Sequence, residues 1–268
     1  MRALVSVQWL YKHLNDALII EVNREPHMGY YQWHIPNSRF LHDDLVYELL
    51  RSGKSPREQY LKGLMDAVGD DTERTMVLYD EGDGRSATLT YLLLRSLGYR
   101  NVAILNGGKR AWLTQVGLQC TCGGKLHNEP TGTRAQPSPS IAINDIVSRD
   151  ELLRAPPRVG ETLTLIDART PEEYETAHIP GAINIPWTVV YNDDGTFREP
   201  SEIRKVLSSH GVNEDSNIII YCRTGHRSSV LWFTMKELLG MPNVKVYLGS
   251  WVEWSSNPES PVKTGPNP

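Results

Sequence analysis

The residue with the clearest capacity for chemistry is a cysteine that ends a run of apolar residues. Residues 218–221 read Ile-Ile-Ile-Tyr, Cys222 follows them, and an apolar segment covers 229–240 after a short polar loop. The β-branched run is typical of a buried parallel strand, and the glycine-terminated segment is typical of a helix. This order predicts that Cys222 lies at the carboxyl edge of a sheet and faces a helix N-terminus, which favours negative charge.

The loop after the strand is basic. It reads Cys222-Arg223-Thr224-Gly225-His226-Arg227. Positive charges and a helix end stabilise a thiolate, so we expect the Cys222 thiol to ionise near neutral pH and to act as a nucleophile. Arg223 and Arg227 are predicted to bind an anionic substrate, and a structural ion pair between Arg227 and an acid of the first half is the alternative.

Three further loop residues complete the predicted substrate-binding site. Thr224, Gly225 and His226 are expected to donate backbone N–H groups, and Gly225 allows the loop to curve. His226 is an acid–base group, a contact for the sulfur acceptor, or a solvated residue at the start of the helix. Away from the loop, Asp167 and Arg169 are predicted to form a buried structural pair, with a catalytic role as the alternative.

Composition limits the functions open to the chain. The 268 residues carry a net charge of −4 and no basic block, which argues against a nucleic-acid partner. No apolar run is long enough to span a membrane, and the N-terminal residues lack the core of a signal peptide. Three cysteines without a disulfide framework fit a reducing compartment. We therefore expect a cytoplasmic monomer with no membrane partner, no metal and no cofactor, in which Cys120 and Cys122 are linker residues or else have a redox or resolving role.

The two halves of the chain repeat one order of elements. Alternating strands and helices predict two α/β domains, each a mainly parallel sheet flanked by helices. The first domain is predicted to cover residues 1–120 and the second domain residues 141–268. Residues 121–140, which are rich in Gly, Pro, Thr and Ser, are predicted to form the linker between them. Strands are predicted at 17–22, 75–80, 102–105, 164–169, 218–221 and 244–247, and helices at 56–68, 87–97, 200–209 and 229–240. Positions related by a shift of 142 are Asp80 and Cys222, Arg85 and Arg227, Gly98 and Gly240, Gly107 and Gly249, and Trp112 and Trp254.

The halves differ at the loop that carries the chemistry. Where the second half has the cysteine, the first has Asp80 followed by Glu-Gly-Asp-Gly-Arg. A carboxylate cannot perform thiolate chemistry, and three acids repel an anionic substrate. The second domain is therefore predicted to be catalytic, and the first is predicted to be an inactive copy.

Several motifs together resemble the rhodanese family of sulfurtransferases, in its tandem form with an inactive N-terminal domain. The resemblance implies that Cys222 attacks the outer sulfur of a small anionic donor, that sulfite or another fragment leaves, and that a Cys222 persulfide passes its sulfur to cyanide, a thiol or a protein. The motifs are Val5-Ser6 with Trp9-Leu10, Asp167-x-Arg169 with Glu172-Glu173-Tyr174, His178-Ile179-Pro180-Gly181-Ala182, the Cys222 loop, and Gly249-Ser250-Trp251-x-Glu253-Trp254.

Within this family the charge of the loop helps to predict the donor. Mercaptopyruvate enzymes typically carry an uncharged loop, whereas Arg223 and Arg227 suit a small dianion, so thiosulfate is the expected donor. Vertebrate-type members have a substrate-binding arginine where this chain has Glu173, so here the positive charge must come from the loop itself.

Four alternatives differ in reaction or in class. A mercaptopyruvate sulfurtransferase uses the same fold and nucleophile, and a persulfide carrier delivers sulfur to a partner protein. An anion-binding regulatory module would not carry sulfur at all. A phosphatase or arsenate reductase is disfavoured because those loops place the arginine six residues after the cysteine, where this chain has Ser228, whereas Arg227 lies five residues after Cys222.

Overall fold

The chain forms two compact units, each with its own sheet. In the computed structural model, the described residues are 3–24, 30, 32–43, 68, 74–96, 98–117, 145–154 and 163–268. One unit contains Met1–Ala142 and Asn192–Phe197, and the other contains Ile143–Tyr191 and Arg198–Pro268. The predicted linker, Cys120, Cys122 and all but the last residue of the helix predicted over 56–68 lie outside the described residues.

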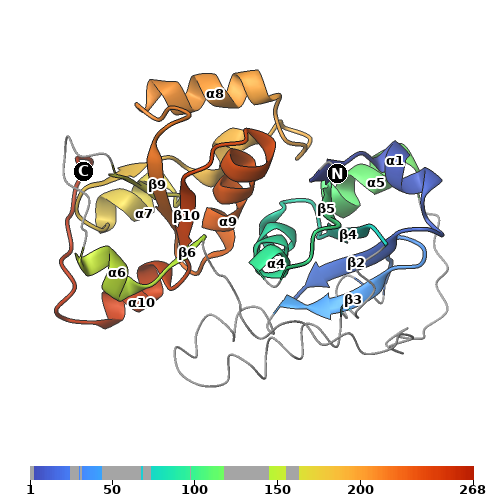
Figure 1. Ribbon diagram of the computed structural model, residues 1–268, viewed down its shortest axis with the longest axis horizontal. Coiled ribbons are helices and arrows are strands. Elements are labelled where there is room, and N and C mark those ends of the chain that lie inside the picture. The colour runs from blue at the N-terminus through green and yellow to red at the C-terminus, as the bar shows by residue number, and fades with distance from the viewer. Residues whose placement is uncertain are drawn as a thin grey trace. The chain divides into compact units, whose positions relative to one another are not determined.

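The sheet of the first unit is parallel, with strand order β1-β5-β4-β2-β3 (Figure 1). Helix α4 packs against β2, β4 and β5, while α1 and α5 contribute to a separate core cluster with these strands. A parallel sheet covered on both faces needs apolar strands, and all residues of β4 and β5 are buried. The elements are β1 (Leu4–Val5), α1 (Val7–Lys12), β2 (Leu18–Asn23), β3 (Arg39–His42), β4 (Met76–Tyr79), α4 (Arg85–Ser96), β5 (Val102–Leu105) and α5 (Gly108–Gln115).

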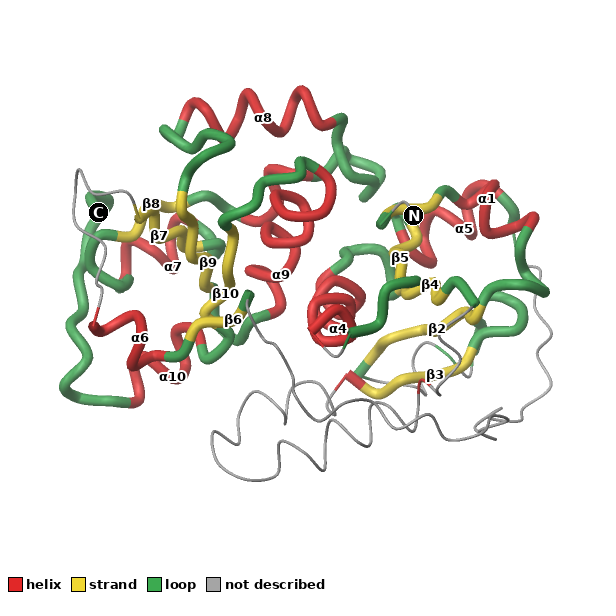
Figure 2. Tube along the Cα trace, in the orientation of Figure 1, coloured by secondary structure: helices red, strands yellow, loops and turns green. Residues whose placement is uncertain are grey.

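The sheet of the second unit repeats this topology, with strand order β6-β10-β9-β7-β8 and every pair parallel (Figure 2). Helix α9 packs on β9 and β10, and the core cluster with α6, α7 and α10 holds Trp254. The elements are β6 (Ile146–Val147), α6 (Arg149–Arg154), β7 (Leu163–Asp167), α7 (Pro171–Thr176), β8 (Ala182–Asn184), the 3₁₀ helix η1 (Trp187–Val190), α8 (Pro200–Ser209), β9 (Asn217–Tyr221), α9 (His226–Phe233), the π-helix η2 (Thr234–Leu238), β10 (Val244–Tyr247) and α10 (Ser250–Ser256).

The repeat extends to single hydrogen bonds. In the first unit the N–H of Ile35 donates to the hydroxyl of Tyr79 at 3.1 Å, and in the second the N–H of Ile179 donates to Tyr221 at 3.1 Å. Each tyrosine is the last residue of the central strand. The bond therefore fixes the His-Ile-Pro turn beside the loop that follows that strand in both units.

Most predicted elements are confirmed, and one helix is wrong at its start. The predictions for 102–105, 200–209 and 244–247 coincide with β5, α8 and β10. The helix predicted to begin at 229 begins at His226, because Gly225 has a φ of +93° and forms the N-cap. Glycine adopts this left-handed conformation without steric cost, so it ends the loop there. In consequence His226, Arg227 and Ser228 lie on the first turn of α9.

Three short strands at the edges of the sheets were not predicted from the sequence. Strands β1 and β6 have two residues each, and β8 has three, too few for a pattern of apolar residues to show. Within the residues that the structure describes, no helix has the length and apolarity that crossing a lipid bilayer requires.

Candidate active site

Strand β9 brings Cys222 to the carboxyl edge of the sheet. It lies between β10 and β7, with Ile218 opposite Val244 and Tyr221 opposite Asp167. Four of its five residues are buried, as a central parallel strand requires. Cys222 follows directly and its side chain is fully buried, which confirms the position predicted from the apolar run.

The backbone of Cys222 is held by the start of α10. Its N–H donates to Ser250 Oγ at 3.2 Å, and its carbonyl accepts from the N–H of Trp251 at 3.0 Å. Ser250 is buried and has a φ of +54°, a region that non-glycine residues rarely adopt. Its hydroxyl also donates to the carbonyl of Tyr247 at 2.9 Å. These bonds fix the main chain from which the thiol projects.

Ser250 was not among the predicted site residues, although the repeat contained a signal for it. Its counterpart in the first unit is Gly108, which has the same φ of +54°. A Cβ on Gly108 would lie 2.7 Å from the carbonyl oxygen of Asp80, so the first unit requires glycine there. A glycine paired with a serine across the repeat indicates a position with an unusual backbone.

Two donors point at the sulfur of Cys222. The N–H of Gly225 lies 3.1 Å from Sγ, and the hydroxyl of Ser228 lies 3.6 Å from it. Ser228 is buried, and its hydroxyl also lies 2.9 Å from the carbonyl of Gly225. Because a hydroxyl carries one proton, it can bond to either acceptor, and a charged sulfur is the stronger one. Both donors, together with the N-terminus of α9, favour a negative charge on Sγ.

The side chains of Thr224 and His226 form a pair that the sequence did not predict. Thr224 Oγ1 lies 3.2 Å from Nδ1 of His226, so their side chains bond to each other. His226 is only 7% exposed, and the idea of a solvated histidine at the helix start is wrong, since the early start of α9 buries it. Among the described residues, the backbone N–H on Sγ comes from Gly225, while N–H donation to substrate by Thr224 and His226 stays a prediction.

The two arginines of the loop have different environments. Arg223 is exposed, and within the described part of the chain no ion pair involves it. Arg227 Nη1 and Nη2 lie 2.5 and 2.9 Å from the two carboxylate oxygens of Glu173. The alternative of an ion pair for Arg227 is thus confirmed, but the expected partner in the first half is wrong, because Glu173 belongs to α7 of the same half.

Helix α7 presents Glu173 through its cap. Thr170 is the N-cap, and its hydroxyl accepts from the N–H of Glu173 while the Glu173 carboxylate accepts from the N–H of Thr170. This reciprocal arrangement fixes the carboxylate at the helix start. The hydrogen bond from Arg227 lowers the pKa of Glu173 to about 2. Burial disfavours the charged guanidinium, but Glu173 and the nearby Cys222 outweigh burial and raise the pKa of Arg227.

The ion pair predicts a pH dependence of stability. A carboxylate whose pKa falls from 4.5 to about 2 on folding stabilises the protein fully above pH 4.5, and this contribution is lost as pH falls toward 2. Since a third of the Glu173 side chain is exposed, we expect roughly 1 to 2 kcal/mol. Denaturant unfolding between pH 6 and 2.5 measures it. The wild-type protein should lose more stability on acidification than Glu173→Gln, and parallel curves would contradict the assignment.

Asp167 and Arg169 form the buried structural pair expected from the sequence. The guanidinium donates to both carboxylate oxygens at 2.5 to 3.0 Å, and both side chains are at most 4% exposed. Arg169 also lies over the ring of Trp251, 4.6 Å from its centre. The pair therefore joins the end of β7 to the start of α10, beside the main chain of Cys222.

In the first unit a carboxylate occupies the corresponding loop. Asp80 follows β4 as Cys222 follows β9, and its Oδ1 accepts the N–H groups of Gly82 and Gly84, both at 3.0 Å. Its Oδ2 accepts the N–H of Ala87 at 3.2 Å. Burial and the charge of Asp83 raise the pKa of Asp80 to about 7. The loop thus binds its own side chain where the second unit presents a sulfur.

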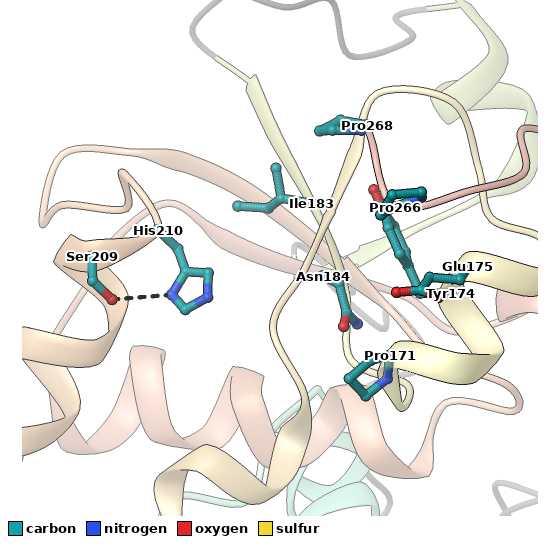
Figure 3. A pocket seen from close by; sticks show the side chains of 9 residues that line it. All are labelled: Pro171, Tyr174, Glu175, Ile183, Asn184, Ser209, His210, Pro266 and Pro268. Carbon is teal, nitrogen blue, oxygen red and sulfur yellow. Dashed lines mark hydrogen bonds between the residues drawn. The ribbon is translucent and has the colours of Figure 1, made fainter.

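A cavity of about 410 Å³ lies elsewhere in the second unit, and Figure 3 shows its lining. Some of its polar groups already have partners: the Asn184 amide donates to two carbonyls at 3.0 Å, and Nδ1 of His210 lies 3.3 Å from the hydroxyl of Ser209. None of its residues belongs to the Cys222 loop, so we do not place the substrate there. The lining comprises Pro171, Tyr174, Glu175, Ile183, Asn184, Ser209, His210, Pro266 and Pro268.

Comparison with known proteins identifies the family of both domains. Both halves match the rhodanese-like domain family, over residues 6–115 and 149–257. The chain belongs to the rhodanese-like family. Two matches in one chain make it a tandem two-domain member, which confirms the resemblance seen in the motifs.

The rhodanese-like relatives cover nearly the whole chain. The sequence is 32% identical over 287 residues to the sulfur carrier protein TtuD of Thermus thermophilus, covering 98% of this chain and 96% of that protein. It is 33% identical over 275 residues to a thiosulfate sulfurtransferase of Azotobacter vinelandii, covering 95% and 94%. These similarities place the chain among the rhodanese-type sulfurtransferases.

Solved structures share the tandem architecture. The anaerobic ergothioneine biosynthesis enzyme from Chlorobium limicola, in complex with trimethyl histidine, superposes with a TM-score of 0.83 at 25% identity, covering 98% of this chain and 70% of that one. The wild-type structure of EanB gives a TM-score of 0.82 at 25% identity, covering 98% and 69%. The two-unit fold is thus shared with an enzyme whose natural substrate is trimethyl histidine.

Proposed function

We propose that this protein moves sulfane sulfur from thiosulfate to a thiophilic acceptor through a persulfide on Cys222. The observation that carries the proposal is the pair of donors on Cys222 Sγ, the Gly225 N–H and the Ser228 hydroxyl, at the start of α9. Such donors stabilise a thiolate, and the N-terminus of α9 also favours the negative charge of a persulfide. The named relative from Azotobacter vinelandii supports thiosulfate as the donor.

The reaction divides into two displacements at sulfur. The Cys222 thiolate attacks the outer sulfur of thiosulfate, the S–S bond of the donor breaks, and sulfite leaves with the bonding electron pair. A nucleophilic acceptor, cyanide or a thiol, then attacks the outer sulfur of the persulfide, and the Cys222 thiolate leaves. The thiolate is regenerated, so no external oxidant or reductant is consumed.

A persulfide carrier is the second candidate. The Thermus thermophilus relative, named as a sulfur carrier, supports it at 32% identity over nearly the full length. The first chemical step is the same, but the acceptor is a partner protein. A carrier would take up one sulfur atom rapidly and release it slowly to small acceptors.

The first unit is proposed to take no part in the chemistry. Its loop lacks a thiol, and three backbone N–H groups are already bonded to the Asp80 carboxylate. An anionic donor would have to displace a side chain tethered to the same loop, and it would meet Glu81 and Asp83.

Thiocyanate formation from cyanide, with thiosulfate and mercaptopyruvate compared as donors, tests the proposal. Faster turnover with thiosulfate is the expected result. Clearly faster turnover with mercaptopyruvate would overturn the donor and leave the nucleophile in place. If the protein takes up sulfur but neither donor supports turnover, the carrier is favoured, and an absence of sulfur uptake would overturn both candidates.

Arg223 is predicted to supply the accessible positive charge for the donor. Arg223→Ala should lower kcat/KM for thiosulfate by tens- to hundreds-fold, because a charged contact in the transition state contributes a few kcal/mol, while stability changes little. Steady-state kinetics and thermal unfolding measure the two effects. The control Lys205→Ala removes an exposed charge from α8 and should leave kcat/KM within about twofold. An unchanged kcat/KM in Arg223→Ala would exclude it from the mechanism.

A further inference from the structure

We propose that Glu173 is a specificity-determining residue that masks the positive charge of Arg227 and thereby weakens the attraction of the Cys222 site for anionic reagents. The proposal builds on sulfur transfer at Cys222 but concerns the charge that any reagent meets there. It also revises the expectation that both loop arginines act on the substrate.

The geometry shows a closed pair. Both Nη atoms of Arg227 engage both oxygens of Glu173, a bidentate arrangement that leaves the carboxylate little freedom. The Thr170 N–H also bonds to the carboxylate, so the side chain is held from the side of its own helix. The Arg227 side chain is 15% exposed, and it cannot turn toward a substrate without breaking this pair.

The charge balance around the sulfur follows from this pairing. Arg227 lies on the first turn of α9, close enough to Cys222 for their charges to interact. With Glu173 ionised the pair is neutral overall, and Arg223 is left as the exposed loop cation. The lowered pKa of Glu173 keeps the mask in place at every physiological pH. The site therefore attracts a dianion with about one charge instead of two.

Replacing Glu173 with glutamine removes the charge and keeps the shape. The amide oxygen can still accept the Thr170 N–H, so α7 keeps its cap. The control Glu172→Gln makes the same change in net charge on the neighbouring, exposed residue. A double variant, Glu173→Gln with Arg227→Gln, removes the unmasked cation as well.

Alkylation of Cys222 tests the charge without sulfur transfer. Iodoacetate is anionic and iodoacetamide is neutral, so the ratio of their rates at the Cys222 peptide, followed by mass spectrometry, reports the local potential. We expect Glu173→Gln to raise this ratio about fivefold to tenfold over the wild type, Glu172→Gln to change it less than twofold, and the double variant to return it to the wild-type value. Thermal unfolding verifies that each variant is folded.

Several results would overturn the proposal. An unchanged ratio in Glu173→Gln, an equal rise in Glu172→Gln, or a rise that persists in the double variant would each do so. Kinetics give a second readout: KM for thiosulfate should fall more than KM for mercaptopyruvate in Glu173→Gln, with kcat nearly unchanged. Should the wild-type protein prove inactive with both donors, the proposed function fails while the alkylation ratio still decides the role of Glu173.

Discussion

Replacing Cys222 with serine is expected to abolish sulfur transfer, lowering thiocyanate formation by on the order of 10⁴-fold or more. A serine hydroxyl stays protonated near neutral pH, and an oxygen in its place forms no persulfide. The backbone bonds to Ser250 and Trp251 do not involve the side chain, so the variant should fold. Incubation with thiosulfate followed by intact-mass analysis should show one added sulfur atom on the wild-type protein and none on the variant.

The chain offers matched controls for this experiment. Cys120→Ser and Cys122→Ser make the same chemical change at the two cysteines interpreted as linker residues. Both should keep sulfur loading and turnover within about twofold of the wild type. A loss of turnover without a loss of loading in either control would instead support their alternative role as resolving thiols. Sulfur loading of the Cys222→Ser variant would refute Cys222 as the carrier.

Replacing Arg169 with alanine is expected to cost the largest amount of stability, about 3 to 5 kcal/mol. The change leaves the carboxylate of Asp167 fully buried and without its guanidinium. It also removes the cation stacked on Trp251, the residue whose N–H holds the carbonyl of Cys222. Chemical denaturation measures the loss of stability. Activity at low temperature should also fall, because the contact between Arg169 and Trp251 supports both the fold and the main chain of Cys222.

A surface ion pair is the matched control for the buried one. Glu214→Gln breaks the pair between Glu214, which is 71% exposed, and Arg204. Exposed pairs contribute little, so this variant should lose less than about 1 kcal/mol. If Arg169→Ala proves no more costly than Glu214→Gln, the buried pair does not stabilise the second unit as proposed.

Much of the architecture followed from local patterns. The β-branched run before Cys222 and the matching run before Asp80 predicted the central strands, and both are confirmed. The repeat at a shift of 142 predicted two domains of the same kind, and the two sheets share one strand order. Such patterns suffice because strand burial and helix ends depend on neighbouring residues and on glycine.

The start of α9 could not be predicted from the pattern of apolar residues. The apolar segment begins at residue 229, but the helix begins at His226, because the φ of Gly225 rather than hydrophobicity sets the boundary. The helix therefore contains three polar residues before the apolar segment. One of them is Ser228, whose hydroxyl lies near Sγ of Cys222. A polar first turn does not show in a pattern of apolar residues, even where one of its side chains contacts the cysteine.

The sequence by itself determined the fold class, the repeat, the position of Cys222 after a central strand and the basic loop. Only the tertiary structure decided which charges remain available. Glu173 and Arg227 are 54 residues apart, and Cys222 and Ser250 are 28 apart, so no spacing along the chain reveals these bonds. Ion pairing depends on distance and burial in three dimensions. The ion pair between Glu173 of α7 and Arg227 of α9 therefore makes one loop arginine a structural partner, and the other stays at the surface.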